Sequence, residues 1–150
     1  MQTANITERN IENAKKLIQE VINTGNLDLC DRYLAAGRID YQDYGLPPGM
    51  ANGHEGFKRV LGPFVEAFPD LHLEVQFTVA DQDRTTFFVS TTGTHHGPFL
   101  GMAPTGKQFK VNGTDIFRFD DAGKIAAHWG VFDTLGMLAQ LGQVQPPGQP

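Results

Sequence analysis

The stretch that decides the fold is FPDLHLEVQFTV, residues 68–79, because the spacing of its apolar residues differs from that of the chain before it. Before Pro69, apolar residues recur at steps of three and four, which is typical of amphipathic helices. After Pro69, apolar and polar residues alternate, which is typical of a half-buried strand; the apolar set is Leu71, Leu73, Val75, Phe77 and Val79. The sequence therefore predicts helices up to this point and strands after it.

Three helices are expected before Pro69, at about residues 7–25, 26–37 and 57–68. A loop that contains GLPPGMANG joins the second helix to the third. Pro63 falls inside the third helix and should kink or restart it, because proline has no amide N–H to donate.

Four strands are expected after Pro69, at about residues 71–79, 85–96, 108–119 and 124–133, followed by a closing helix at 134–141. Helices followed by consecutive antiparallel strands predict an α+β domain with the helices packed on one face of the sheet. A sheet of such long strands must curl, because strands twist. A curved antiparallel sheet covered by helices forms a cone, and its interior is a natural pocket for a ligand.

Length and composition indicate one domain, residues 1–142, with a flexible tail at 143–150 (QVQPPGQP) that has little to bury. The net charge of -5 and the lack of a Lys/Arg run argue against nucleic acid and anionic membrane surfaces. No apolar run reaches the roughly 18 residues of a membrane span, and the N-terminus lacks the apolar core of a signal peptide. A cytoplasmic protein with a small-molecule or protein partner is expected.

Strand parity places two carboxylates in the expected pocket. The odd-numbered residues form the more apolar face of residues 108–119 and of residues 124–133. If both apolar faces point inward, odd residues must pair with odd ones, as in Asp115 with Trp129. Asp115 and Asp133 then lie inside the cone, roughly 13 Å apart at about 3.3 Å per residue.

Carboxylates on an apolar face suit acid/base chemistry, because desolvation raises a carboxylate's pKa toward neutral pH. Asp133 is therefore the candidate general acid/base that removes and returns a proton next to a carbonyl without a cofactor, and Asp115 and His95 are candidates to polarise the oxygens of the substrate. His95, beside the long loop after the second strand, is a candidate second proton-transfer group or a hydrogen-bonded strand-end residue. The candidate pocket walls are Trp129, Phe117, Phe99, Val111 and Val131.

Both aspartates also have structural interpretations. Asp133 precedes a helix and could cap its first turn, an effect of about 1 kcal/mol, although Thr134 could serve as the cap instead. Asp115 could be a structural acid paired with Arg118 or Lys110. The pattern alone does not choose between these roles.

No metal or cofactor site is expected. None of the five histidines shows a metal-ligand spacing, and His95 and His96 point to opposite faces of a strand. The segment GMAPTGKQ, residues 101–108, approaches the phosphate-binding loop GxxxxGK[ST]. It lacks the final hydroxyl and is followed by a strand rather than a helix, so we reject that assignment.

Four segments carry a resemblance to a known family: FPDLHLEV, GTHHGPFLGMAPTGK, GTDIFRFDDAGKI and HWGVFDTLGMLAQLG. In this order and spacing they resemble the SnoaL-like polyketide cyclases, often labelled ester cyclases, over nearly the whole chain. The resemblance implies the nuclear-transport-factor-like cone fold, usually as a homodimer or higher homo-oligomer. It also implies a cofactor-free intramolecular aldol cyclisation of a polyketide methyl ester, with Asp133 at the position of the general acid/base aspartate.

One position departs from that pattern. Many members of the family have a histidine in the loop after the second helix, where this chain has Gln42-Asp43. The expected activity is cyclisation or isomerisation of a hydrophobic, oxygenated small molecule. Two alternatives remain: a ligand-binding module of the same fold without catalysis, and a hydrolase that activates water on an epoxide or ester.

Overall fold

The computed structural model describes residues 2–36, 40–43, 48–145 and 148, and their elements follow the predicted order of helices before strands. The helices are α1 (Gln2–Lys16), a π-helical turn η1 (Leu17–Ile22), a 3-10 helix η2 (Leu27–Arg32), α2 (Gly53–Ala67) and α3 (Thr134–Gln140). The strands are β1 (Asp40–Asp43), β2 (His72–Asp81), β3 (Arg84–Thr94), β4 (Gln108–Phe119) and β5 (Ile125–Phe132).

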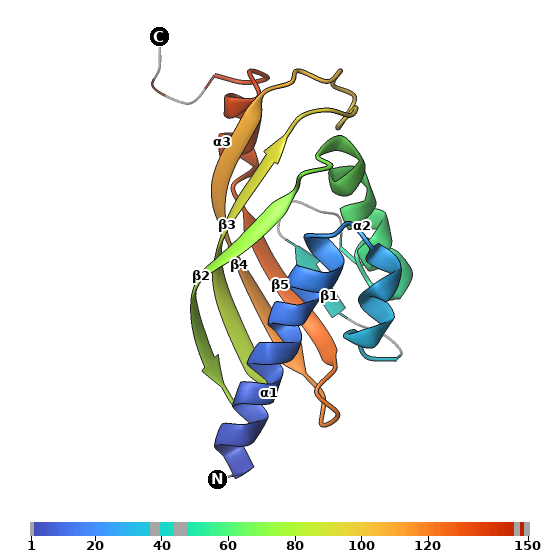
Figure 1. Cartoon of the computed structure of the whole chain (residues 1–150), viewed down its shortest axis with the longest axis vertical. Helices are drawn as coiled ribbons and strands as arrows, with labels where there is room; N and C mark the ends of the chain where they lie inside the picture. Colours follow the sequence, from blue (N-terminus) through green and yellow to red (C-terminus); the bar gives the residue numbers. More distant parts are fainter. Residues whose placement is uncertain (1, 37–39, 44–47, 146–147, 149–150) are drawn as a thin grey trace.

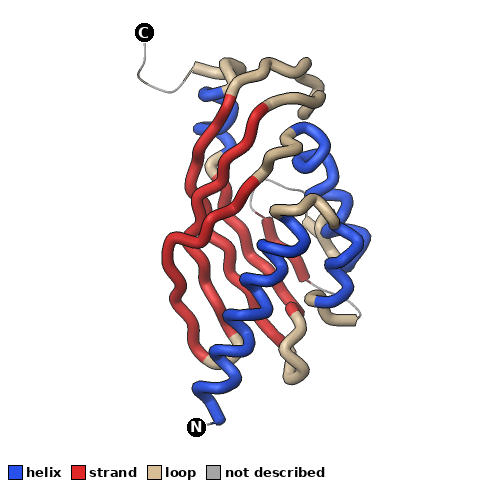
Figure 2. Tube along the Cα trace, in the orientation of Figure 1, coloured by secondary structure: helices blue, strands red, loops and turns tan. Residues whose placement is uncertain are grey.

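All five strands form one twisted sheet in the order β1-β5-β4-β3-β2. Strands β2 to β5 are antiparallel neighbours, and β1 joins the other side of β5 in parallel. Helices α1 and α2 lie on the same side of the sheet (Figures 1 and 2). The predicted α+β class, with helices packed on a curved antiparallel sheet, is confirmed. Strand β1 lies in a segment predicted as loop, since four residues are too few for a period to show.

Two helix boundaries differ from the prediction. The first helix begins at Gln2 rather than near Thr7, and it ends before Gly25, whose φ of +71° suits a helix stop. The third helix does not restart at Pro63, because α2 runs without interruption from Gly53, four residues before the predicted start, to Ala67. Pro63 is exposed, so water can bond the carbonyl group that its ring leaves free.

Two expectations fall partly outside the described residues: the end of the second helix near Gly37, and most of the tail at 143–150. Within the described part, no helix has the length and hydropathy of a bilayer span.

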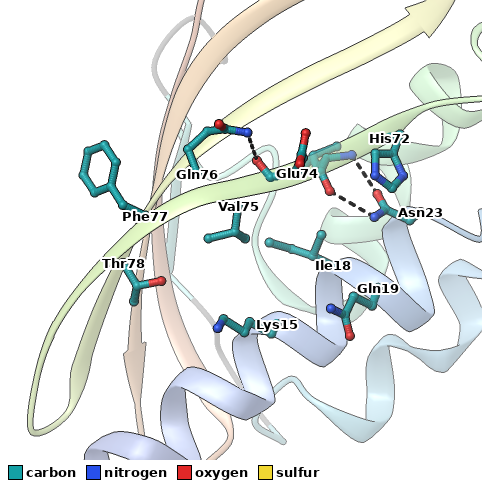
Figure 3. Close-up of a pocket in the computed structure, with 11 residues that line it drawn as sticks. Lys15, Ile18, Gln19, Asn23, His72, Glu74, Val75, Gln76, Phe77 and Thr78 are labelled. Atoms are coloured by element: carbon teal, nitrogen blue, oxygen red, sulfur yellow. Dashed lines mark hydrogen bonds between the residues drawn. The ribbon is translucent and has the colours of Figure 1, made fainter.

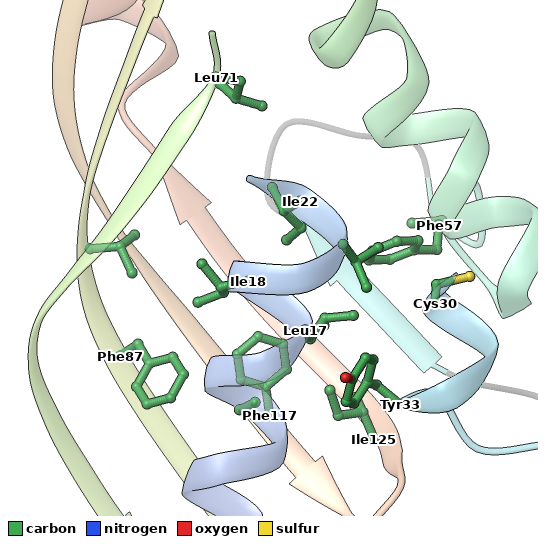
Figure 4. Packing of buried hydrophobic residues seen from close by; sticks show 14 of the residues in the cluster. Leu17, Ile18, Ile22, Cys30, Tyr33, Phe57, Leu71, Phe87, Phe117 and Ile125 are labelled. Carbon is green, nitrogen blue, oxygen red and sulfur yellow. The ribbon is translucent and has the colours of Figure 1, made fainter. Parts of the chain in front are cut away.

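The core lies between α1 with η1 and the face of the sheet that they cover, called here the inner face (Figure 4). Ile18 lies on the side of the helix that faces Phe87 of β3, and Leu17 lies on the side of Tyr33. A second group of rings, called here the aromatic cluster, consists of Phe64, Phe68, Phe99, Phe109 and Phe132. Phe68 is at its centre and is fully buried.

Two β-bulges decide which side chains reach the inner face. In β2 the register shifts between Val75 and Phe77, and Phe77 is 56% exposed on the opposite, outer face. In β5 the pair Phe119–Ile125 is followed by Arg118–Ala127, so Ala126 is the extra residue. An extra residue exchanges the two faces of a strand from that point on, because side chains alternate with a period of two.

The bulge at Ala126 makes the predicted hairpin register wrong. Asp115 pairs with Gly130 rather than with Trp129, which lies opposite Ile116. Odd residues of β4 therefore meet even residues of β5 beyond the bulge. Trp129 and Val131 consequently lie on the outer face, where Val131 is 55% exposed, instead of lining the interior.

Candidate functional site

A hydrogen-bonded pair of titratable side chains, Asp115 and His128, lies on the inner face. His128 Nε2 is 2.8 Å from Asp115 Oδ1. The two residues come from β4 and β5 and are diagonal neighbours, since Asp115 is opposite Gly130 and His128 is opposite Phe117. The Asp115 side chain is 21% exposed and the His128 side chain 10%. The pair is therefore largely shielded from solvent, but its carboxylate is still partly accessible from outside.

The bulge at Ala126 creates this pair. With unbroken alternation, His128 would share the outer face with Ala126 and would not reach Asp115. The parity expected from the sequence puts His128 on the outer face, away from the site. A usable signal was present, because a buried acid needs a polar partner and His128 is the one titratable residue of β5.

Aromatic rings form the surroundings of the pair. The rings of His128 and Phe117 have centroids 4.9 Å apart and are tilted by 36°. Phe87, which is fully buried, lies directly opposite Asp115 on β3, and its ring centroid is 5.9 Å from that of Phe117. This apolar wall keeps bulk water from one side of the carboxylate.

Two glycines are the neighbours of Asp115 on the other side. Gly113 precedes it by two residues on the same face of β4, and Gly130 is its partner on β5. Neither has a side chain to fill the inner face at this point. At Gly113 a Cβ atom would lie 2.8 Å from the carbonyl oxygen of Val131, so the close approach of the strands requires glycine there. The carboxylate of Asp115, 21% exposed, therefore has backbone rather than side chains beside it on this side.

Strand β1 lies next to this part of the sheet, with the backbone of Asp43 opposite Gly130. Gln42 and Asp43 of β1 stand where many members of the resembled family have a histidine. The side chains of Gln42 and Asp43 lie outside the described residues.

The two oxygens of the Asp115 carboxylate differ in their surroundings. Oδ1 accepts the contact from His128, whereas Oδ2 has no hydrogen-bond partner within the described residues. Neither Arg118 nor Lys110, the alternative partners expected from the sequence, forms an ion pair with Asp115 in the described structure. Oδ2 is therefore the atom that can accept a proton from, or donate one to, a bound molecule.

Asp133 lies away from this pair and caps α3. Its Oδ1 accepts a hydrogen bond of 2.8 Å from the backbone N–H of Gly136, and the residue is exposed. The capping alternative is thus confirmed for Asp133, and Thr134 is the first residue of the helix rather than its cap. The two aspartates do not share a face as the predicted register required.

We expect Asp133→Ala to lower the free energy of unfolding by about 1 kcal/mol, because the first turn of α3 then loses its side-chain acceptor. Urea unfolding followed by circular dichroism measures this change. Thr134→Ala is the matched control and should cost less, since Thr134 accepts no capping bond. Equal losses for both variants would contradict the assignment of the cap.

His95 is fully buried at the end of β3 and lies far from Asp115. Phe87 is opposite Asp115, and His95 follows eight residues later, which is about 26 Å along an extended strand. Its ring lies against Phe68, with centroids 5.4 Å apart, and contacts Thr105 of the loop before β4. The structure therefore does not bring His95 together with Asp115.

The other predicted wall residues separate into two groups. Phe117 and Val111 lie on the inner face and are buried, and Phe99 is buried in the aromatic cluster. Trp129 and Val131 lie on the outer face. Phe117 alone among the five contacts the Asp115–His128 pair directly.

A surface groove of about 440 Å³ lies elsewhere, between α1 with η1 and the edge strand β2 (Figure 3). Ile18 and Val75 point into it, with Lys15, Gln19 and Gln76 around them. Asn23 closes one end, because its side chain bonds both the N–H and the C=O of Leu73. The groove contains none of the residues that the sequence predicted for the site.

The described residues include neither a cluster of metal ligands nor a reactive cysteine. They contain no group of three or more His, Cys, Asp and Glu side chains arranged to hold a metal ion. Cys30 is buried, and burial together with the neighbouring Asp31 raises the pKa of its thiol to about 11. A thiol with this pKa stays protonated near neutral pH and is a weak nucleophile.

The chain is similar to one family of known proteins in its sequence and in its fold. The sequence profile of the SnoaL-like polyketide cyclases matches residues 12–141. No curated protein matches the chain. Among solved structures, IdmH, a proposed polyketide cyclase from Streptomyces antibioticus, is 31% identical, with 89% of this chain and 98% of that chain covered and a TM-score of 0.73.

Two further structures are similar over most of their length. A proposed polyketide cyclase from Acidithiobacillus ferrooxidans is 29% identical, with a TM-score of 0.80 and coverage of 91% of this chain and 96% of that one. AclR, a proposed hydroxylase from Streptomyces galilaeus, is 25% identical, with a TM-score of 0.81 and coverage of 96% and 86%. The three relatives share the fold and differ in the activity proposed for them.

Proposed function

Because the chain belongs to the SnoaL-like polyketide cyclase family, we propose that it is a cofactor-independent acid/base enzyme acting on a hydrophobic carbonyl compound of the polyketide class. The reaction is an intramolecular aldol-type cyclisation. The observation that carries this proposal is the Asp115 carboxylate, hydrogen-bonded to His128 on an apolar face beside two glycines.

Asp115 is the general acid/base in this proposal. Oδ2 removes a proton from the carbon next to a carbonyl group, and the enolate carbon attacks a second carbonyl of the same molecule. The new C–C bond forms as the π bond of that second carbonyl breaks and leaves an alkoxide, which takes the proton back from Asp115. The substrate and the product are isomers, so the step needs neither an oxidant nor water.

His128 is a positioning residue for that carboxylate. Its Nε2–H donates to Oδ1, which holds the carboxylate in one orientation and leaves Oδ2 as the oxygen for the substrate. Phe87 and Phe117 limit water around the pair, which strengthens the electrostatic interactions within the site. The chemistry is thus assigned to Asp115 and its orientation to His128.

Asp115 is preferred over Asp133 because the two carboxylates have different surroundings. Asp133 is exposed, and its oxygen is occupied by the N–H of Gly136. In the described structure Asp133 therefore has no apolar surroundings that would hold a hydrophobic substrate against it. Asp115 has the apolar neighbours and the available oxygen that proton transfer from carbon requires.

Product analysis in ¹⁸O-labelled water tests the proposal, with linear and partly cyclised aromatic polyketide methyl esters as candidate substrates. A cyclase gives a product with the mass of its substrate and no oxygen from the solvent. Uptake of one ¹⁸O atom would instead identify a hydrolase. Binding of these esters without conversion would support a ligand-binding module and overturn the proposed activity.

A further inference from the structure

The loop between β3 and β4, residues 95–107, closes on itself at His95, and the backbone N–H groups of His96 and Gly97 bond its start to the carbonyl of Ala67 at the end of α2. The backbone N–H of His95 donates to the carbonyl of Lys107, and the N–H of Gly106 donates to the carbonyl of His95. The imidazole is fully buried and makes a third link, to Thr105. Figure 1 shows this loop at one end of the molecule, next to the end of α2.

The third link depends on the protonation state of His95. Nδ1 accepts from the backbone N–H of Thr105 at 3.3 Å and lies 3.1 Å from its hydroxyl oxygen. That hydroxyl oxygen accepts from the N–H of Lys107, so its own proton is available for Nδ1. An N–H donor facing Nδ1 requires that this nitrogen carry no proton. The ring is therefore neutral, with its proton on Nε2.

The other ring nitrogen, Nε2, has no acceptor among the described residues that could stabilise a protonated imidazole. Nε2 of His95 is buried and has no hydrogen-bond partner in the described structure. The ring lies against Phe68, and Phe68 in turn packs on Phe99 and Phe109. A second ring proton would place a positive charge among aromatic rings and set two N–H donors against each other at Thr105.

The charged groups nearest in the chain do not pair with the imidazole. Lys107, Glu66 and His96 are exposed and form no hydrogen bond to the His95 ring within the described structure. Asp70 instead accepts from the N–H and the hydroxyl of Thr94, at 2.7 and 2.6 Å. Burial raises the pKa of Asp70, but these hydrogen bonds outweigh it and hold that pKa below its ordinary value. Among the described residues, no carboxylate forms a hydrogen bond or ion pair with the His95 ring.

We propose that His95 and Thr105 form a pH-sensitive latch on residues 97–107. The neutral ring holds the loop closed, and protonation releases it, since the ring can then hydrate both of its N–H groups. The loop carries Phe99, the member of the aromatic cluster at this end of the molecule. The centroid of its ring lies 4.8 Å from that of Phe64 and 5.2 Å from that of Phe68. Opening therefore exposes one end of that cluster. This inference is independent of the proposed function.

Amide hydrogen exchange at pH 7.5 and pH 5.0, corrected for the intrinsic exchange rate, tests the latch on the full chain. Protection of residues 97–107 should fall by up to about tenfold for each pH unit over which His95 takes up its proton on opening. Protection of residues 85–91 of β3, which carry no titratable side chain, is the internal reference. Equal protection of the loop at both pH values would overturn the proposal.

Two variants separate His95 from its neighbour. His95→Asn keeps an oxygen acceptor for the Thr105 N–H and does not titrate, so protection of the loop should become independent of pH. His96→Asn removes an exposed histidine next to the latch and should behave like the unmodified protein. A pH dependence that persists in His95→Asn, or disappears in His96→Asn, would contradict the assignment.

A measurement on the unmodified protein covers the case in which His95→Asn fails to fold. The ring ¹⁵N shifts of His95 report its tautomer and its protonation. The proposal requires the Nε2–H tautomer at pH 7.5, and it requires the protonation midpoint to coincide with the midpoint of loop opening. A different tautomer, or two separate midpoints, would overturn it.

Discussion

Asp115→Asn is expected to lower turnover of a polyketide ester about 10²- to 10⁴-fold, the usual contribution of one general acid/base group. Asparagine has nearly the shape of aspartate, and its oxygen can still accept from His128 Nε2. The substitution therefore removes proton transfer and leaves the packing in place. The measurement is kcat and KM for the ester that the unmodified protein converts, with the loss expected in kcat.

Two further variants make this result specific. Asp133→Asn changes the other candidate aspartate and should keep turnover within a few-fold, because Asp133 caps α3 and is exposed. His128→Gln should lower turnover less than Asp115→Asn, since it disturbs the orientation of the carboxylate and not the carboxylate itself. Full activity in Asp115→Asn, or its loss in Asp133→Asn, would reverse the assignment.

Phe68→Ala is expected to lower the free energy of unfolding by about 3–5 kcal/mol, the usual cost of truncating a buried phenylalanine. Phe68 is fully buried, and its ring lies 5.0 to 5.4 Å from the rings of Phe109, Phe99 and His95. The resulting cavity would lie among rigid rings that cannot close around it. Urea unfolding followed by circular dichroism gives the change from the transition midpoint.

Phe77→Ala is the matched control, because it makes the same chemical change on the outer face. Phe77 is 56% exposed and stacks on Phe88, with ring centroids 5.0 Å apart. Its loss should cost well below half as much as that of Phe68. Similar costs at both positions would show that the outer face is as tightly packed as the core, which contradicts the burial described above.

The element order and the fold class could be predicted from the sequence because they follow from local spacing. Apolar residues at steps of three and four before Pro69, and at steps of two after it, are properties of the chain itself. Phe117 and Val111 were placed correctly on the inner face, because β4 has no bulge before Phe119. Strand β1 was not found, since a four-residue strand pairs through its backbone and leaves little pattern.

The candidate site required the register between strands. Asp115 was found from its parity, but its partner was assigned as Trp129 on β5. Both strands alternate cleanly as sequences, and nothing in that alternation shows that Ala126 would be left out of the pairing. Asp133 illustrates the same limit, since its pattern allowed a cap or a pocket acid, and the cap became evident only from its bond to Gly136.

The sequence by itself determined that helices precede a curved sheet and which face of β4 carries Asp115, because helix and strand periods are local properties of the chain. Only the tertiary structure decided that His128, and not Trp129, meets Asp115 on the inner face. The physical reason is the bulge at Ala126: one unpaired residue exchanges the faces of a strand, and the position of such a residue is set by the hydrogen bonds to the neighbouring strand.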